Sequence, residues 1–147
     1  MQFVKQPVDA YPAITKQYRR WGERAKCGKR DLVYTLADAK GQWIAAARLL
    51  PVEGDTYLLR NLTVAPSLRR QGIARLLMQR IVTDDSIQSL YCYALEYLEA
   101  FYLSVGFATK TPEQVPSAIA QPYQRYRANG KSFVLMGFEL PRGLTGV

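Results

Sequence analysis

The sequence predicts an α/β fold of the α+β kind, in which an antiparallel run of strands leads into one strand, loop and helix at the centre of the chain. Three observations indicate it. Residues 57–82, YLLRNLTVAPSLRRQGIARLLMQRIV, read as a strand, a proline stop and a helix. The residues before them contain short apolar runs separated by turn residues, as in hairpins. The residues after them alternate further strand-like runs with a short helical pattern.

The N-terminal part begins with an expected strand at residues 3–6, which Pro7 closes, and an expected basic helix at residues 11–24. The helix is predicted because large apolar residues recur every three or four positions, which places them on one face. They are Tyr11, Ile14, Tyr18 and Trp21. A loop at residues 27–31 follows.

A hairpin is expected next, with strands at residues 32–36 and 42–50 around a turn at 39–41. A second turn, at residues 51–55, leads to the central strand at 57–64. These strands read as an antiparallel meander.

The central helix is predicted from Gly72 onward, because its apolar residues fall on one face. They are Ile73, Leu76, Leu77 and Ile81, whereas Arg75, Gln79 and Arg80 lie off that stripe. The elements expected after it are strands at residues 87–94, 107–110 and 133–140 and a short helix at 95–103. Gly106 stands where a helix C-terminal cap is expected. Three prolines predict that residues 111–130 are the least regular segment.

Length and composition fit one globular domain over residues 1–147, because 48% of the residues are hydrophobic and 22% are charged. No apolar run approaches the roughly 20 residues that a membrane helix needs. The first residues also lack the apolar core of a signal peptide. We therefore expect a cytoplasmic protein without a membrane partner, and we find no repeat, linker or second domain.

The residue types exclude several chemistries. Histidine is absent, which removes the usual general base and most zinc sites. Cys27 and Cys92 are isolated and lack metal-ligand spacing, so we expect free thiols and no metal site. Lys26 and Lys29 would lower the thiol pKa of Cys27, although we expect no catalytic role for it.

The formal net charge of +8 favours anionic partners, such as nucleic acid, an acidic metabolite, an acidic protein patch or a phosphate-rich cofactor. The charge is concentrated in residues 16–30, which contain, before Asp31, seven cationic residues and Glu23 as the single acidic residue among them. A solvated helix face explains such a run equally well.

The loop between the central strand and helix predicts a seat for a diphosphate. Its residues are Arg69, Arg70, Gln71, Gly72, Ile73 and Ala74. A helix begins with unpaired N–H groups and a partial positive charge, so its first turn attracts anions. Gly72 lets a phosphate approach the main chain, and the two arginines add full charges. The alternative is an ordinary turn with a solvated arginine pair.

Neither a P-loop nor the three-glycine dinucleotide fingerprint is present. The loop instead resembles the acyl-CoA loop of the GCN5-related N-acetyltransferase (GNAT) superfamily, with Arg69, Gly72 and Ala74 at its pattern positions. The resemblance is specific over residues 57–107. It implies a GNAT-like mixed, mostly antiparallel twisted sheet of six to seven strands flanked by about three to four helices. The N-terminal part would be abbreviated, since the family usually has two helices between its first two strands.

A second segment, FYLSVGF at residues 101–107, resembles the family's Phe-Tyr, three residues, Gly-Phe pattern. The resemblance implies that Tyr102 is the general acid that protonates the departing CoA thiolate. A phenol beside the sulfur can donate the proton that a leaving thiolate needs. With ten tyrosines in the chain, packing is the alternative role for any one of them.

The resemblance further implies an acetyl-CoA-dependent N-acetyltransferase that moves the acetyl group directly to a primary amine. Main-chain groups of Val64 and Leu62 would hold the acyl carbonyl and the pantetheine arm. Many members carry on this strand a glutamate that acts as the general base, but here Arg60-Asn61 stands where acidic residues often occur. The general base is therefore unassigned: Glu53, Glu96, Glu99, a water chain or an amine that arrives neutral are open alternatives.

Residues 16–30 and 111–130 would flank the acceptor cleft in such a fold, which favours an amine acceptor that carries anionic groups. Two other functions compete with the enzyme. One is a CoA-sensing module without turnover. The other is a nucleic-acid-binding protein, because tyrosines and arginines alternate at residues 123–127, although a surface loop explains that pattern more simply. Dimers are common in families of this type, so a homodimer is among the states that the sequence leaves open.

Overall fold

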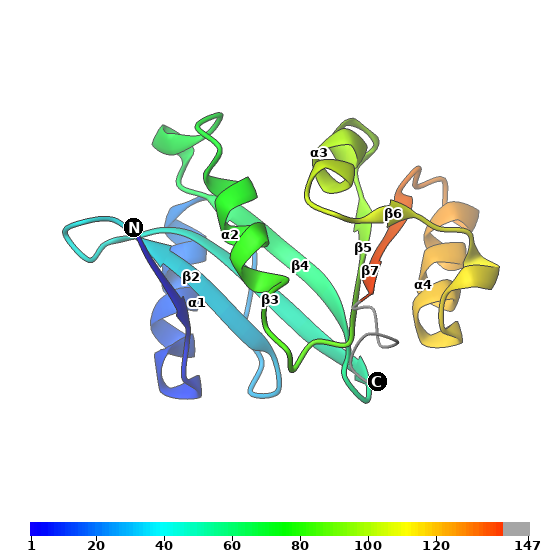
Figure 1. Cartoon of the computed structure of the whole chain (residues 1–147), viewed down its shortest axis with the longest axis horizontal. Coiled ribbons are helices and arrows are strands. Elements are labelled where there is room, and N and C mark those ends of the chain that lie inside the picture. Colours follow the sequence, from blue (N-terminus) through cyan, green and yellow to red (C-terminus); the bar gives the residue numbers. More distant parts are fainter. Residues whose placement is uncertain (140–147) are drawn as a thin grey trace, which may run out of the picture. The chain divides into compact units, whose positions relative to one another are not determined.

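A computed structural model describes residues 1–139 of the chain (Figure 1). Within this range, seven strands are hydrogen-bonded in the order β1-β2-β3-β4-β5-β7-β6, and four α-helices accompany them. The sheet is mixed and mostly antiparallel, which confirms the predicted fold class. Two compact units share the chain: Met1–Pro51 with Leu59–Asp84, and Val52–Leu58 with the chain from Asp85 onward.

The first unit holds the meander and two helices. Its elements are β1 (Gln2–Lys5), α1 (Tyr11–Arg20), β2 (Leu32–Ala37), most of β3 (Trp43–Glu53), most of β4 (Thr56–Val64) and α2 (Ile73–Ile81). Strand β2 pairs antiparallel with β1 and with β3. Helices α1 and α2 lie on opposite faces of these strands (Figure 1). A short 3-10 helix at Val8–Ala10 and α1 stand between the first two strands, in agreement with the abbreviated N-terminal part.

The second unit holds the C-terminal strands. Its elements are β5 (Ser89–Ala94), α3 (Glu99–Ser104), β6 (Ala108–Thr109), α4 (Ser117–Ala128) and β7 (Val134–Glu139). The start of β4, Thr56–Leu58, pairs with β5 in parallel. Strand β7 pairs antiparallel with both β5 and β6. Leu140, which we expected to end the last strand, lies outside the described residues.

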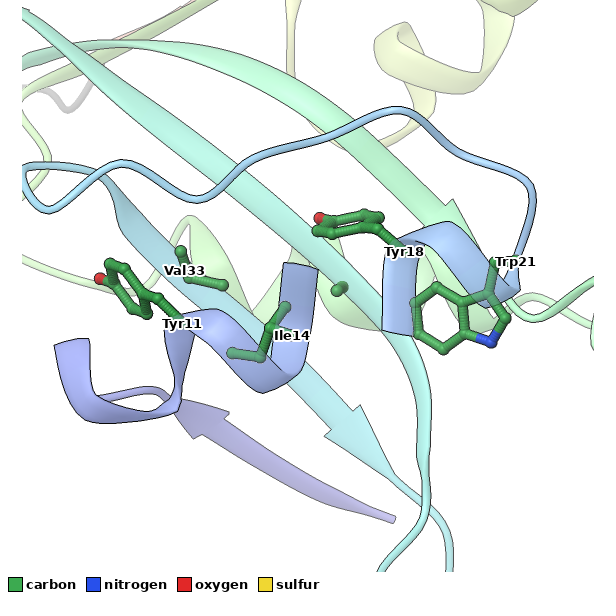
Figure 2. Close-up of a cluster of buried hydrophobic side chains, with 6 residues drawn as sticks. Tyr11, Ile14, Tyr18, Trp21 and Val33 are labelled. Carbon is green, nitrogen blue, oxygen red and sulfur yellow. The ribbon is translucent and has the colours of Figure 1, made fainter. Parts of the chain in front are cut away.

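Helix α1 packs its apolar face on β2 and β3, as the periodicity predicts. Tyr11, Ile14, Tyr18 and Trp21 are buried together with Val33 and Ala46 (Figure 2). The face is therefore part of the core of the first unit, and the charged residues of α1 lie outside it. None of the helices in the described part of the chain is long and apolar enough to cross a bilayer.

The expected end of α1 at residue 24 is wrong, because the helix ends at Arg20. Gly22 adopts a left-handed φ of 81°, and its N–H donates to the Arg19 carbonyl at 3.0 Å. The N–H of Glu23 reaches back to the Tyr18 carbonyl at 2.9 Å. This pair of bonds is a Schellman motif, which satisfies the last carbonyls of a helix and requires glycine at the turn.

The expectation that residues 111–130 are irregular is also wrong. Helix α4 occupies Ser117–Ala128 and buries Ile119, Ala120 and Tyr123 on one face. Pro116 stands just before the first helical residue, where a proline costs no hydrogen bond. Pro122 lies inside the helix and removes one main-chain donor. The helical spacing of the apolar residues outweighs the three prolines in this segment.

Smaller differences concern the ends of elements. Strand β3 continues to Glu53, so the turn before β4 is confined to Gly54 and Asp55. Strand β5 begins at Ser89, two residues later than expected. On α2 the buried residues are Ile73, Leu77, Met78 and Ile81. Leu76 is 36% exposed, so the buried face of α2 is rotated about the helix axis from Leu76 towards Met78.

Candidate functional site

The loop between β4 and α2 is built as the sequence predicts. The strand ends where the Ala65 N–H donates to the Ile44 carbonyl at 2.8 Å, and a short 3-10 turn, Pro66–Leu68, follows. Two residues then take left-handed conformations, Arg70 with φ 66° and Gly72 with φ 78°. Glycine reaches that region without cost, but for arginine it is strained by about 1 kcal/mol. Strain of this kind is concentrated at functional sites.

The first turn of α2 presents free main-chain donors. Gly72 is the N-cap residue, and no side chain caps the helix there. The first helical bond inside α2 runs from the Leu76 N–H to the Gly72 carbonyl at 3.1 Å. A β-carbon built on Gly72 would meet no atom within 4 Å, so the approach to the amides is open. The arrangement offers an anion the positive end of a helix at the surface.

Two arginines of the loop precede this opening in sequence. Arg69 and Arg70 are exposed, as are Gln71 and Gly72. The Arg69 Nε also donates to the Val64 carbonyl at 3.2 Å, which ties the loop to the end of β4. The structure therefore brings together all the residues that were predicted to bind the cofactor. Leu62, Val64, Arg69, Arg70, Gln71, Gly72, Ile73 and Ala74 lie on consecutive elements of the first unit.

Tyr102 belongs to the second unit, where α3 holds it in an aromatic cluster. Its ring centroid lies 5.1 Å from that of Phe101 and 5.3 Å from that of Phe107. The residue is only 7% exposed, and burial, with a smaller contribution from Cys92, raises the pKa of its hydroxyl. Among residues 1–139 the hydroxyl has no hydrogen-bond partner, and no buried side-chain polar atom there lacks one. The Tyr102 hydroxyl therefore reaches the surface and is free to donate.

The first unit also contains a charged pocket of about 530 Å³. It lies between the segment that follows α1 and strands β3 and β4. The lining residues are Arg19, Glu23, Arg24, Ala25, Lys26, Arg48, Arg60 and Asn61. Part of the basic segment therefore lines a pocket instead of covering a plain surface. Glu23 and Asn61 were not predicted as site residues, because their contact joins positions 38 apart in sequence.

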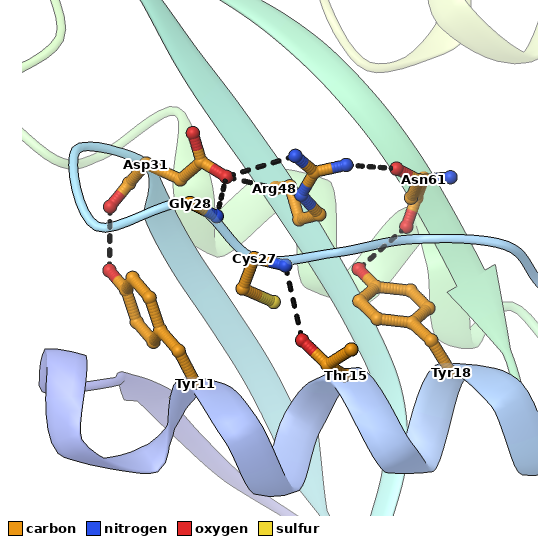
Figure 3. Close-up of polar contacts among 8 residues, drawn as sticks. All are labelled: Tyr11, Thr15, Tyr18, Cys27, Gly28, Asp31, Arg48 and Asn61. Atoms are coloured by element: carbon orange, nitrogen blue, oxygen red, sulfur yellow. Dashed lines mark hydrogen bonds and ion pairs between the residues drawn. The ribbon is translucent and has the colours of Figure 1, made fainter.

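Two of the lining residues, Arg48 and Asn61, belong to a polar network (Figure 3). Arg48 donates from Nη2 to Asp31 Oδ2 at 3.0 Å and from Nη1 to Asn61 Oδ1 at 2.6 Å. The Asn61 carbonyl accepts from the Tyr18 hydroxyl at 2.8 Å. Asn61 itself has a left-handed φ of 54° within β4. The network therefore fixes both the main chain and the side chain of Asn61.

Replacing Asp31 with alanine should destabilise the protein by about 3 kcal/mol, because it leaves the Arg48 charge buried without a partner. Asp31 is 8% exposed and also accepts from the Gly28 N–H at 2.7 Å. Urea denaturation measures the change. The exposed pair Lys110–Glu139, with 3.8 Å between its charged atoms, provides the control: Lys110→Ala should cost less than about 1 kcal/mol. Equal losses in the two variants would contradict a structural role for the Arg48–Asp31 pair.

The expectation of a lowered thiol pKa for Cys27 is wrong. Cys27 is half-buried and its main-chain N–H donates to Thr15 Oγ1 at 3.1 Å, and burial raises the pKa of its thiol instead of lowering it. The tyrosines of α4 point inward. Tyr93 stacks on Tyr123 with 6.2 Å between ring centroids, and Tyr126 packs on Phe133 at 5.3 Å. Tyr123 is buried and therefore not available to stack on a nucleotide base, whereas Tyr126 is partly exposed.

Comparison with known proteins identifies the family. The model of the acetyltransferase (GNAT) domain matches residues 30–109, which is more than half of the chain and includes both the loop and Tyr102. The chain belongs to the GNAT acetyltransferase family. A UPF0039 protein of Schizosaccharomyces pombe is 30% identical to this GNAT chain over 110 residues, which cover 71% of the chain and 67% of the yeast protein.

Solved GNAT structures share the fold of this chain. Rv2747 of Mycobacterium tuberculosis, in complex with CoA, superposes with a TM-score of 0.68 at 14% identity over 96% of this chain and 100% of its own. A GNAT acetyltransferase of Elizabethkingia anophelis with acetyl-CoA bound gives 0.61 at 14% identity, over 95% of this chain and 97% of its own. N-acetylglutamate synthase of Neisseria gonorrhoeae, complexed with CoA and N-acetyl-glutamate, gives 0.67 at 17% identity over 96% of this chain. This chain spans 36% of that synthase. At these identities the likeness concerns the fold alone.

Proposed function

We propose that this GNAT chain is an acetyl-CoA-dependent N-acetyltransferase, that residues 1–147 act as one N-acetyltransferase domain, and that the acceptor is a primary amine. The observation that carries the proposal is the open helix N-terminus at Gly72, with Arg69 and Arg70 beside it. An uncapped helix start with adjacent guanidinium groups suits a diphosphate, which carries more than one negative charge.

Different residues would bind different parts of the cofactor. The amides of Gly72, Ile73 and Ala74 would donate to the diphosphate oxygens, and Arg69, Arg70 and Gln71 would surround them. Leu62 and Val64 would offer main-chain groups to the pantetheine arm and the acyl carbonyl. These residues follow one another along β4, the loop and the start of α2. Successive main-chain groups would therefore contact successive parts of the elongated cofactor.

Acetyl-CoA, when bound, supplies the thioester whose acyl group is transferred. Tyr102 would donate its phenolic proton to the sulfur as the carbon–sulfur bond breaks. Burial raises the pKa of this hydroxyl, so the phenol carries its proton at neutral pH. The hydroxyl also has no acceptor among the described residues with which a leaving thiolate would compete.

Two measurements test the proposal together. Acetyl-CoA should raise the melting temperature, because a ligand that binds only the folded state stabilises it. Release of free thiol from acetyl-CoA should then be measured with a panel of primary amines, and at least one class of amine should accelerate it. Absence of thermal protection by acetyl-CoA would contradict the proposed seat.

A second candidate is a CoA-sensing module without turnover. It is favoured by one observation: strand β4, Thr56–Val64, contains no carboxylate that could serve as a base. In that case acetyl-CoA would raise the melting temperature, but no amine would increase thiol release above the rate of hydrolysis. The two measurements therefore separate the enzyme from the sensor.

A further inference from the structure

We propose that the charged pocket of the first unit binds the acceptor, that the acceptor is an amine carrying a carboxylate or phosphate, and that Glu23 receives the proton of the amine. The inference rests on the proposed function and assigns its substrate class and its missing base. It follows from three features of the pocket: its unbalanced charge, the way Glu23 is held, and its place on β4.

The charge of the pocket is strongly positive. Five cationic side chains line it against a single carboxylate, that of Glu23. Arg48 is satisfied by its ion pair with Asp31, whose charged atoms are 3.0 Å apart. The other four cations have no ion-pair partner among residues 1–139; they are Arg19, Arg24, Lys26 and Arg60. Such a pocket attracts an anionic group and repels polycations such as polyamines.

Hydrogen bonds fix both the main chain and the side chain of Glu23. Its N–H closes the Schellman motif that ends α1, at 2.9 Å from the Tyr18 carbonyl. Its carboxylate accepts from Asn61 Nδ2 at 3.0 Å through Oε1. Asn61 is oriented in turn by Arg48, so the amide must present its nitrogen to Glu23. The second carboxylate oxygen has no partner within the described range and can accept from a substrate.

The pocket and the proposed diphosphate seat are built on the same strand. Arg60 and Asn61 line the pocket, and Val64 ends β4 where the loop begins. Three residues of extended chain span about 10 Å. Leu62 and Val64 lie between the residues that line the pocket and the diphosphate loop. An acyl group held by their main chain would therefore be next to an amine that contacts Glu23. The missing strand carboxylate is thereby replaced by one from another element that reaches the same strand.

The proton transfers balance. The neutral amine attacks the acyl carbon, and as the carbon–nitrogen bond forms, its N–H becomes acidic and passes a proton to the Glu23 carboxylate. The carbon–sulfur bond then breaks, and the thiolate takes a proton from Tyr102. The products are an N-acetylated acceptor and free CoA thiol. Proton exchange with water afterwards returns Glu23 to the carboxylate and Tyr102 to the phenol.

Matched acceptor pairs test the substrate class. Each pair differs only in the anion: an amino acid against its amide, and ethanolamine phosphate against ethanolamine. For at least one pair, kcat/KM should be about tenfold higher for the anionic member, and the ratio should fall as salt is added. Arg60→Gln should reduce the ratio, and Arg60→Lys should preserve most of it. Arg20→Gln is the control, because Arg20 is an exposed cation of α1 that does not line the pocket.

Glu23→Gln tests the base. This variant keeps the backbone cap and the size of the side chain, so kcat should fall by about a hundredfold or more while KM changes little. Glu113→Gln, an exposed carboxylate variant in the second unit, should behave as the parent. A rise in KM with kcat unchanged would overturn the assignment of Glu23.

The outcomes distinguish the inference from the proposed function. If neutral and anionic amines are acetylated at equal rates, the enzyme stands and the substrate class is wrong. If no amine is acetylated, thermal protection decides: the anionic members should still raise the melting temperature of the parent but not of Arg60→Gln. Equal protection of both proteins, or of neither, would overturn the anionic pocket independently of catalysis.

Discussion

Replacing Gly72 with glutamate is expected to weaken CoA binding by at least about tenfold, since a like charge about 4 Å from a phosphate costs roughly 1 to 4 kcal/mol at a protein surface. The new carboxylate would stand at the N-cap of α2, in the open space that the proposed diphosphate occupies. It would also compete for the same main-chain amides. Isothermal titration with CoA measures the loss.

The strain of a side chain at positive φ must be separated from this effect. Gly41 provides the control, because its φ of 81° is close to the 78° of Gly72 and a β-carbon there also meets no atom. Both glutamate variants should lose about 1 kcal/mol of stability. Only the Gly72 variant should lose CoA affinity. Unimpaired CoA binding by Gly72→Glu would count heavily against the placement of the diphosphate.

Replacing Tyr102 with phenylalanine should reduce turnover by about 100-fold to 10,000-fold, which is the usual contribution of a positioned acid. The affinity for acetyl-CoA should remain within about twofold, and stability should change by less than about 0.5 kcal/mol. The small cost follows from the structure, because the ring keeps its contacts with Phe101 and Phe107 and the hydroxyl has no partner to lose among residues 1–139. Steady-state kinetics and a CoA titration measure the two effects.

Tyr97→Phe is the matched control, because Tyr97 precedes α3 and is 79% exposed. It should leave turnover unchanged. The pH dependence adds a second check: the pKa of the Tyr102 hydroxyl is raised, so the acid stays protonated through its ordinary range and loses its proton only at higher pH. Turnover of the parent should therefore show no alkaline decline caused by this group near pH 10. Normal turnover by Tyr102→Phe would remove the residue from the mechanism.

Local patterns in the sequence predicted most of the fold, and they failed where a second signal was overlooked. The strand β4 and the helix α2 follow directly from the apolar pattern and from Gly72. The predicted end of α1 is wrong because it lies beyond Gly22, although the apolar set ends at Trp21 and a glycine after a helical run is itself a stop signal. Helix α4 was missed because its prolines were weighed more heavily than the spacing of Ile119 and Tyr123.

The two parts of the candidate site differ in how far the sequence could predict them. The diphosphate loop is contiguous, so a run of six residues contains all the chemistry that identifies it. The pocket is assembled from α1, the segment after it, β3 and β4. The contact between Glu23 and Asn61 depends on the pairing of strands and on a left-handed residue in β4, neither of which leaves a local pattern. Glu23 is therefore absent from the bases that the sequence suggests, which are Glu53, Glu96 and Glu99.

The division of β4 between the two units has a practical consequence. The chain passes from one unit to the other after Pro51, after Leu58 and after Asp84, so each unit is a set of discontinuous pieces. No truncation at a single point yields either unit intact for separate expression. Only a rearranged gene, with the pieces rejoined by linkers, would isolate one of them.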